Sequence, residues 1–439
     1  MMNRFAQPTA LRALILLVIC LLLASCVQPA VGPRGQILVA WHSLTGSKER
    51  ALLELIDQWN QTNPDGITVV PERRAAPSLN SSIVEGIAKN ALPALALVPS
   101  AQAAVYNQKG ALAPMNALID DGSALVGWGA NDRADLYPFV MKAGQTPNGG
   151  VVGIPFGGTL RLMLYNRDWL KTLNLDESPA DWDHFTQACA AATDRAKGSL
   201  CFGADPNSVT FEQWLFAHGG HTTTDDMSVL QVSTPAALAA MNHLSDLVHA
   251  NLAYRVTSPQ QSRDDFSTSR VLFAFDWSDG LDDIAAAVKL HADFDWGVSL
   301  LPSDGQPTNT KYRAPLWVIL RQQSKADPAR EKAAWLFIRW LTAKEQTAQW
   351  TARTGELPAR LSATKILNAR QSLDANHLAV LQTIAPLARP EPMIRGWKCV
   401  ENVLSTSVRQ IFEGKTVTET LQLAQATGQP VLNQDCTTQ

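Results

Sequence analysis

Apolar runs of strand length alternate with amphipathic helical segments between residues 36 and 100. The runs QILVAWHS, GITVVP and ALALVPS are short, aliphatic and bounded by polar, Gly or Pro positions, which is typical of buried strands. Two helical segments lie between them: 47–64, which has one apolar face and Ser47 in position to cap it, and 79–90. This β-α-β-α-β order predicts a parallel sheet flanked by helices, and so an α/β fold.

Ligands of open α/β sheets bind beyond the carboxyl ends of the strands. The first predicted strand ends in Trp41, His42 and Ser43, and Ser100 follows the third. An indole, an imidazole and two hydroxyls at one sheet edge favour a ligand site. A core position for Trp41 remains the alternative.

The alternation continues further along the chain, with Gly and Pro between the apolar runs. The stretch 148–170 contains a Gly-rich kink between two apolar strands. Helices are expected to begin at three capping positions, Asp181, Thr234 and Asp327, the last of them running to about residue 350. The tail from Glu356 onward is expected to be mainly helical.

The N-terminus has the pattern of an export signal that ends in a lipidated cysteine. An apolar core of residues 13–24 follows two arginines and is too short to span a hydrocarbon core of roughly 30 Å. It ends in Leu-Ala-Ser-Cys, which resembles a bacterial lipobox with Cys26 as the acylated first residue of the mature chain. We therefore expect a signal peptide at 1–25, a tether at 26–36 and an extracytoplasmic, membrane-anchored protein. A buried N-terminal helix or an ordinary signal is the alternative.

Charge argues against nucleic-acid binding. Removal of the leader takes Arg4 and Arg12 from 37 basic residues and leaves 35 against 40 acidic residues. No basic cluster offsets this balance, so a phosphate backbone is not the expected partner.

Four cysteines remain after Cys20 is cleaved off and Cys26 is lipidated. An extracytoplasmic location favours disulfides, and four cysteines allow three pairings. We favour the two most local ones, Cys189–Cys201 and Cys399–Cys436. Four free thiols are the alternative, and no C-x-x-C spacing indicates a metal or redox site.

About 410 mature residues exceed one ordinary core and predict two domains. Six motifs then occur in an order that resembles the family 1 extracellular solute-binding proteins of bacterial ABC sugar importers. They are GIPF at 153–156 with LYNRD at 164–168, PADWDHF at 179–185, SRVLF at 269–273 with Trp277, WGVSLLP at 296–302, AWLFIRWL at 334–341 and GELPAR at 355–360.

Further stretches are similar to the glycerol-3-phosphate/maltose-binding-like branch of that family. They are WHSLTG at 41–46, NPD at 63–65, LWVI at 316–319 and the segment 392–421. Arg395 falls near that branch's phosphate-binding arginine. Two departures stand out: the branch's PFNSS is PFGGT here, and Ala314 and Pro315 replace the glycines before LWVI.

The resemblance implies a two-lobe periplasmic-binding-protein fold of the Venus flytrap type, with a mostly parallel sheet in each lobe and lobes discontinuous in sequence. We place hinge crossings at 153–158, 300–303 and 354–358. Lobe I would then comprise 37–155 and 304–353, and lobe II 156–303 and 354–439. Hinge closure would bury a ligand in the cleft.

The expected function is that of a substrate-binding protein and not of an enzyme. Such a protein needs no cofactor or metal. It would act as a monomer that delivers a small molecule to the transmembrane subunits of an ABC permease. The expected ligand contacts are Trp41, His42, Ser43, Ser100, Phe156, Gly157, Thr159, Trp214, Asp276, Trp277, Ser278, Trp317, Arg395 and Trp397.

Rings stack on sugar faces while polar groups bond the hydroxyl rim, which suits this set of residues. Loss of the serines near 157 leads us to favour a neutral sugar over a glycerol phosphate or its diester. Two rival classes of function are a glycan-cleaving lipoprotein, with Glu212 and Asp276 as its carboxylates, and a rigid adhesion lipoprotein.

Overall fold

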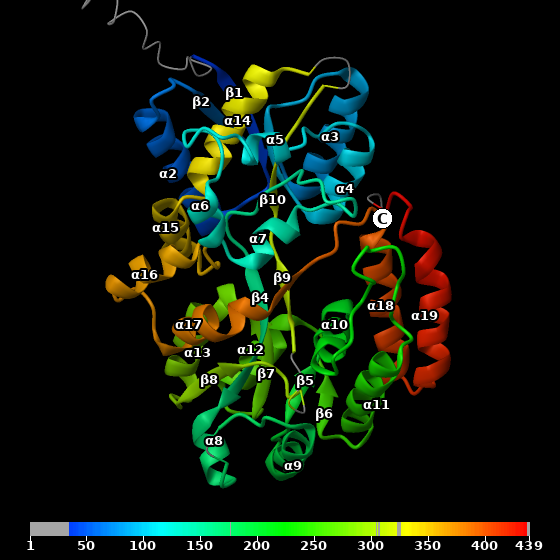
Figure 1. The fold of residues 1–439 in the computed structure, drawn as a ribbon. Helices are drawn as coiled ribbons and strands as arrows, with labels where there is room; N and C mark the ends of the chain where they lie inside the picture. The colour runs from blue at the N-terminus through cyan, green and yellow to red at the C-terminus, as the bar shows by residue number, and fades with distance from the viewer. Residues whose placement is uncertain (1–34, 176, 304, 306–307, 323–325, 437–439) are drawn as a thin grey trace, which may run out of the picture.

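The computed structural model describes residues 35–175, 177–303, 305, 308–322 and 326–436, and it shows two α/β lobes, one above the other in Figure 1. The predicted leader 1–25 and Cys26 lie outside the described residues, as does most of the tether 26–36. The chain passes between the lobes before β4, between β9 and β10, and after α15.

The first lobe is built on a four-stranded sheet in the order β10-β3-β1-β2. Its strands are β1 (Ile37–His42), β2 (Thr68–Arg73), β3 (Leu95–Val98) and β10 (Leu316–Ile319). Its helices are α2 (Gly46–Thr62), α3 (Ala76–Lys89), α4 (Ser100–Gln108), α5 (Asn116–Ile119), α6 (Ala130–Ala134), α7 (Pro138–Ala143), α14 (Pro328–Leu341) and α15 (Lys344–Thr354). β1 runs parallel to β2 and β3, which confirms the predicted β-α-β-α-β unit, and β10 joins β3 antiparallel.

Two local predictions in this lobe are wrong. Thr45, not Ser47, is the N-cap residue of α2, and its side chain makes no capping hydrogen bond. The helix that begins after Asp327 is not continuous, because it ends at Leu341 and α15 starts afresh at Lys344. The break falls at Thr342 and Ala343, and Ala343 is the extended N-cap residue of α15.

The second lobe is centred on the long strand β4 (Thr159–Asn166), which pairs antiparallel with three strands, β7 (Phe273–Trp277), β8 (Trp296–Ser299) and β9 (Thr310–Arg313). β11 (Ala388–Pro390) runs parallel to β9, and β5 (Phe202–Ala204) pairs parallel with β6 (Ala253–Arg255). The expectation of a mostly parallel second sheet is therefore wrong. The segments that link β4 to these strands contain several helices and are long enough to bring a strand back in either direction, so the β-α order alone did not decide the pairing.

The helices of this lobe flank its sheet (Figure 1). They are α8 (Arg167–Thr172), α9 (Trp182–Ala192), α10 (Ser208–Ala217), α11 (Pro235–His249), α12 (Pro259–Ser267), the 3₁₀ turn η2 (Ser278–Gly280), α13 (Leu281–His291), α18 (Trp397–Phe412) and α19 (Val417–Val431). Asp181 accepts from the backbone N–H of His184, and Thr234 from that of Ala237, so both predicted caps are confirmed.

The segment that follows α15 is helical, as expected, and leads back to the second lobe. It comprises α16 (Leu361–Ala369), α17 (Ala375–Ala379), the π-helical turn η3 (Val380–Ile384) and the 3₁₀ turn η4 (Ala385–Leu387). α16 packs against α15, whereas α17 and η3 contact β8.

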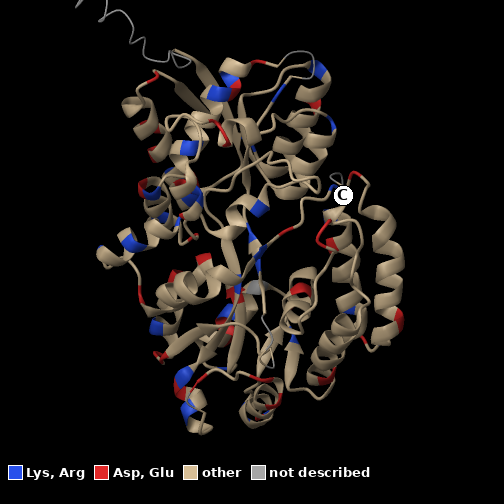
Figure 2. Cartoon of the chain, viewed as in Figure 1, with Lys and Arg blue, Asp and Glu red and all other residues tan. Residues whose placement is uncertain are grey.

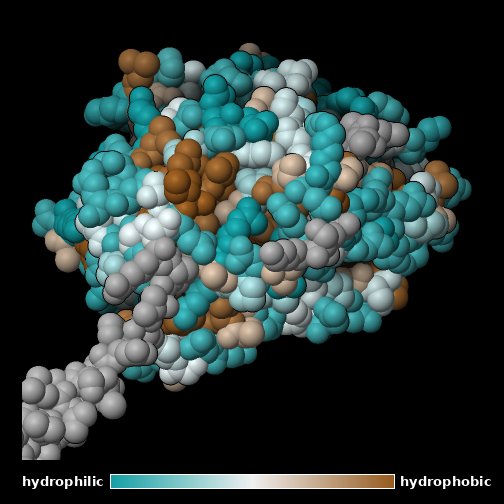
Figure 3. Space-filling view, turned by 90° about the horizontal axis from the view of Figure 1, so that it is seen from above, coloured by the Kyte–Doolittle hydropathy of each residue, from teal (hydrophilic) through white to brown (hydrophobic). Residues whose placement is uncertain are grey.

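Charged residues lie on the helices of both lobes and also along the strands that connect them (Figure 2). Figure 3 shows the end of the molecule above the first lobe, which is mostly hydrophilic with small groups of apolar side chains. No helix within the described ranges is both long and apolar enough to span a bilayer.

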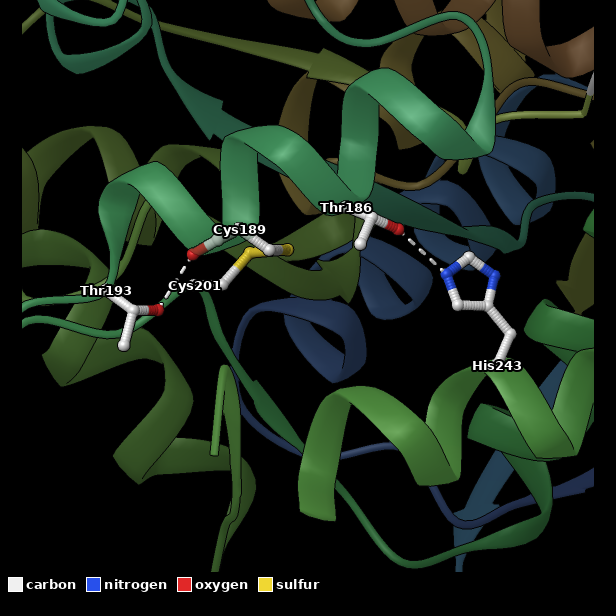
Figure 4. The surroundings of a disulfide bond; sticks show 5 residues. All are labelled: Thr186, Cys189, Thr193, Cys201 and His243. Carbon is white, nitrogen blue, oxygen red and sulfur yellow. Dashed lines mark hydrogen bonds between the residues drawn. A yellow bond between two sulfur atoms is a disulfide. The ribbon is translucent and has the colours of Figure 1, made fainter. Parts of the chain in front are cut away.

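Both predicted disulfides are present. Cys189 on α9 bonds to Cys201 at the start of β5, beside the hydrogen bonds of Thr193 and Thr186 (Figure 4). Cys399 on α18 bonds to Cys436 and so fastens the C-terminal end of the described chain to the second lobe.

Candidate ligand-binding site

Three adjacent strands of the second lobe place an aromatic ring and two guanidinium groups together. Arg161 on β4 lies directly opposite Trp277 on β7, and Thr159 on β4 lies opposite Arg313 on β9. Opposed residues of antiparallel strands project to the same face, so Arg161, Trp277 and Arg313 share one face of the sheet at its hinge end. We call these three residues the arginine–tryptophan group.

Both guanidinium groups lie close to the Trp277 ring. Cζ of Arg313 is 4.0 Å from the ring centroid and Cζ of Arg161 is 5.7 Å from it, within the range of cation–π attraction. Arg313 is exposed and Trp277 is half-buried, whereas only 9% of Arg161 is accessible. Burial lowers the pKa of Arg161 to about 10, and Asp276 and Asp205 partly oppose that shift.

The carboxylates around this group are differently engaged. Asp276 binds Arg263 through both oxygens, with 2.9 Å between Nη2 and Oδ1, and accepts from the backbone N–H of Trp277 at 2.7 Å. Asp205 lies just before α10 and accepts from the Asn207 amide at 2.6 Å. Burial raises the pKa of Asp205, and Arg161 opposes this. Asp276 is thus already paired, while Asp205 has acceptor capacity left.

A buried ion cluster adjoins the group on β9. Lys311, 2% exposed, places its Nζ 2.5 Å from Glu212, 3.1 Å from Glu391 and 3.2 Å from Glu401. Burial acts to lower the pKa of Lys311, but the three carboxylates outweigh it and raise that pKa. Burial raises the pKa of Glu212 to about 7, with Lys311 opposing. One ammonium therefore neutralises only part of the carboxylate charge.

An open groove lies between the lobes beside this cluster. Its volume is about 350 Å³, and it is lined by Lys142 and Gln145 of the first lobe, by Thr223, Thr224, Asp225 and Met227 of the second, and by Asn309 and residues 388–392. Glu391 belongs to both the groove and the Lys311 cluster, so the two adjoin each other.

The strand ends of the first lobe carry a similar combination of ring and charge. Trp41 donates through Nε1 to Glu72 at 2.9 Å, and the guanidinium of Arg74 lies 3.9 Å from the centroid of its ring. His42 is buried, and its Nδ1 has no partner among the described residues. Ser43 is half-buried after β1, and Ser100 is the buried first residue of α4.

The remaining predicted contacts around the kink take part in hinge structure. Thr159 donates to Asp279 at 2.8 Å and lies 3.1 Å from Ser278, whose hydroxyl accepts from the backbone of Leu160. Phe156 packs on Trp350 with 4.3 Å between ring centroids. The carbonyl of Gly157 accepts from Tyr312.

A lysine of the first lobe reaches the same hinge. Lys48 on α2 forms ion pairs with Asp279 of the second lobe at 2.8 Å and with Glu356, just after α15, at 2.6 Å. Glu356 also accepts from the Trp350 indole at 2.9 Å. We call Lys48, Asp279 and Glu356 the hinge triad.

Four other predicted contacts lie away from the arginine–tryptophan group. Trp214, Trp317 and Trp397 are 0–2% exposed in the hydrophobic cores, so their rings have no surface to offer a ligand and we leave them out of the proposed site. Arg395 pairs with Asp435 at 3.1 Å, and Asp435 also pairs with Lys109 of α4. That guanidinium is engaged in holding the C-terminal end.

Sequence reasoning missed Arg161 and Arg313. A signal for Arg161 was present, because an arginine inside the apolar run TLRLMLY breaks the pattern of a wholly buried strand. The groove residues Lys142 and Glu391 gave no such signal, since they follow from how distant segments meet.

Two α/β lobes joined by several chain crossings, with rings and charges where the strands meet the hinge, define a two-lobe substrate-binding protein. The model of the bacterial extracellular solute-binding protein family matches residues 54–373, and the chain belongs to that family. It is a family of solute-binding proteins, not of enzymes.

Relatives and solved structures extend the likeness over most of the chain. The sn-glycerol-3-phosphate-binding periplasmic protein UgpB of Yersinia enterocolitica is 24% identical over 424 residues, 90% of this chain and 91% of its own. The sugar-binding protein MalE of Xanthomonas citri has a TM-score of 0.77 at 18% identity, covering 90% of this chain and 97% of its own. UgpB of Mycobacterium tuberculosis, in complex with glycerophosphocholine, has a TM-score of 0.68 at 21% identity, covering 91% and 98%. These structures support the two-lobe fold.

Proposed function

We propose that this protein is the lipid-anchored substrate-binding component of an ABC importer and captures a carbohydrate between its two lobes. The observation that carries the proposal is the half-buried Trp277 ring, with the Arg313 guanidinium 4.0 Å from its centroid and the Asp276 carboxylate bonded to its backbone N–H. A sugar presents an apolar C–H face to such a ring and its hydroxyls to the charged rim. Trp41 is 9% exposed, packs in the hydrophobic core and has the Arg74 guanidinium 3.9 Å from its ring centroid, so we leave it out of the stacking site.

Binding of a sugar in this way requires only a modest net binding free energy. A micromolar ligand requires about −8 kcal/mol net, which a stacked ring and a few satisfied hydrogen bonds can supply. The proposed lobes are 37–155 with 314–353 and 156–313 with 354–439, because β9 pairs with β4 of the second lobe and moves the expected boundary from 303 to the end of β9. The lobes close on the ligand as the hinge moves. The protein then acts as a monomer and passes its ligand to the transmembrane subunits of a permease.

A glycerol phosphate or its diester is the second candidate ligand. The relatives named for sn-glycerol-3-phosphate align over most of the chain, and one of the similar structures holds glycerophosphocholine. The two guanidinium groups beside Trp277 also favour an anionic ligand.

The test is a thermal-shift screen of the mature domain against mono- and oligosaccharides and glycerol phosphates. A true ligand raises the unfolding temperature of wild-type protein and is recovered unchanged. Trp277→Ala should lose at least about tenfold in affinity, since an aromatic contact and its buried area are removed. Trp169→Ala, a half-buried tryptophan on α8, is the matched control. A ligand that is consumed would indicate the glycan-cleaving enzyme instead.

The anchor is tested separately at Cys26. Cys26→Ala should abolish incorporation of radiolabelled fatty acid and leave the protein unprocessed. Label that persists on Cys26→Ala protein at the membrane would refute the lipobox.

A further inference from the structure

Arg161 is a buried cation whose hydrogen-bonding capacity the described chain leaves unused. Its side chain is 9% exposed, and its Nε has no hydrogen-bond partner among the described residues. The carboxylates of Asp276 and Asp205 act on it through Coulomb attraction, without a hydrogen bond. Burying a guanidinium group without hydrogen-bond partners costs free energy. A buried arginine of this kind therefore suggests that a ligand supplies the missing partners.

The neighbours of Arg161 cannot supply the missing acceptors. Asp276 is bound through both oxygens to Arg263, and the Arg161 backbone carbonyl is itself engaged as the acceptor of the Thr310 hydroxyl. Asp205 has acceptor capacity left but makes no hydrogen bond to Arg161. The open hydrogen-bonding positions therefore remain available to a bound molecule.

The second guanidinium of the group has the same character. Arg313 is exposed, its Cζ lies 4.0 Å from the centroid of the Trp277 ring, and its backbone is fixed by the pairing of β9 with β4. Two guanidinium groups thus face one shared ring. Of the two described carboxylates that attract Arg161, Asp276 is neutralised by Arg263, which leaves Asp205 to balance the pair. Asp279 also attracts Arg313, but it is already paired with Lys48 of the hinge triad.

We infer that Arg161 and Arg313 together bind an anionic oxygen group of the ligand, either a carboxylate or a phosphoryl group, while Trp277 covers the adjoining carbon skeleton. This inference rests on the proposed function and narrows its ligand to an acidic sugar or a polyol phosphate. Guanidinium donors match the paired oxygens of both anions, and such charge-assisted bonds are the strong ones. Arg395, already paired with Asp435, has no part in this subsite.

An arginine that binds the ligand and an arginine that stabilises the fold differ in how their replacement changes stability and affinity. Without ligand, Arg161 is buried and its Nε has no hydrogen-bond partner among the described residues, so replacing it by an apolar chain of similar length should not destabilise the protein. With ligand, the same replacement removes a charged hydrogen-bonding partner and should weaken binding at least about tenfold. A purely structural arginine would show the opposite, with lost stability in the ligand-free protein.

The experiment compares wild-type protein with Arg161→Met, Arg161→Lys and the matched control Arg195→Met, an exposed arginine in the same lobe. Unfolding temperatures and tryptophan fluorescence titrations are measured with glucuronic acid, glucose 6-phosphate and sn-glycerol 3-phosphate. Glucose and maltose form the neutral arm.

Binding of an anionic probe is expected to weaken as salt rises, to fall at least about tenfold in Arg161→Met and less in Arg161→Lys, and to stay unchanged in Arg195→Met. The ligand-free unfolding temperature of Arg161→Met should equal or exceed that of wild type. The carboxylate and phosphate probes then identify which anion is preferred.

Binding of neutral sugars alone, or undiminished binding of anions by Arg161→Met, would overturn the inference and leave the proposed function intact. A ligand-free Arg161→Met protein that melts several degrees lower would assign Arg161 a structural role and also overturn it. If wild-type protein binds no probe of either arm, the proposed carbohydrate function fails and the inference falls with it.

Discussion

The role of the Arg395 side chain depends on its ion-pair partner. From the sequence it could be a phosphate ligand, but in the structure it pairs with Asp435 at 3.1 Å, and that carboxylate also pairs with Lys109. Both side chains of the Arg395–Asp435 pair are partly exposed, so the pair contributes at most about 1 kcal/mol.

We expect Arg395→Lys to leave ligand affinity within a factor of two or so of wild type and to lower stability by less than about 1 kcal/mol. Titration of both ligand classes and urea unfolding measure the two effects. A large, phosphate-specific loss of affinity would return Arg395 to the binding site and contradict its assignment to the C-terminal end.

Glu212 makes stability depend on pH. Burial raises its pKa to about 7 in the folded protein, against 4.5 for an unperturbed glutamate. Between these values the folded state keeps a proton that the unfolded chain has lost. The contribution of Glu212 to stability therefore falls as pH rises from about 4.5 to 7 and changes little above that.

Glu212→Gln cannot ionise, and Lys311 keeps Glu391 and Glu401 as partners. The stability of the variant relative to wild type should therefore grow across this window, by up to about 3 kcal/mol. Urea unfolding at a series of pH values measures the difference, with exposed Glu419→Gln as the control. A difference that is constant with pH would show that Glu212 ionises normally.

Residue chemistry alone indicated part of the site. An aromatic residue between polar ones in the run FDWSDG indicated Asp276, Trp277 and Ser278 as candidate contacts, and the structure brings them next to Thr159 and Arg161. The choice among buried tryptophans could not be made, because Trp214 and Trp277 both follow polar residues in sequence. Only the packing of Trp214 against Trp182 and Phe185 distinguishes them.

At the scale of elements, the crossing into β4 depends on close approach of backbone to side chains. A Cβ atom at Gly157 would lie 2.3 Å from Nε1 of Trp350 and 2.8 Å from Oε2 of Glu356, which are hydrogen-bonded to each other. A methyl group there would force apart the start of the second lobe and the end of α15.

Gly157→Ala should therefore destabilise the protein by about 1–3 kcal/mol, a typical cost of overpacking. Gly122→Ala is the matched control, because a Cβ atom there meets nothing within 4 Å. Thermal and urea unfolding report the comparison. Equal stability of both variants would mean that the crossing is looser than the structure indicates.

The elements were predictable where the cause is local. Caps such as Asp181 and Thr234 satisfy backbone N–H groups three residues on, so short sequence patterns contain the whole interaction. The antiparallel surroundings of β4 were missed because its neighbours β7, β8 and β9 come from residues more than a hundred positions later. No local pattern encodes the direction of such partners.

At the scale of the whole molecule, the hinge triad connects the relative position of the lobes to the crossing segments. Lys48 belongs to the first lobe, Asp279 to the second and Glu356 to the segment after α15. Burial opposes the charged form of Lys48, but Glu356 and Asp279 outweigh it and raise its pKa, so the lysine stays charged at neutral pH.

A cognate ligand should compact the molecule as it closes the lobes. Small-angle scattering should give a smaller radius of gyration at saturation, while Trp277→Ala protein at the same ligand concentration should change less. An unchanged scattering envelope at saturating ligand would favour a rigid binding module over hinge closure.

The position of β10 in the first sheet has a consequence for how the protein is made. Leu316 pairs with Val98 and Ile319 with Leu95, so the edge of a sheet begun near residue 37 is covered by a strand that emerges from the ribosome more than two hundred residues later. Such distant pairing folds slowly, because a long loop must close before its contacts form. During that delay the backbone edge of β3 stays open to pairing with other chains. The same delay would suit secretion, because a chain that cannot complete its first sheet remains threadable until most of it has been synthesised.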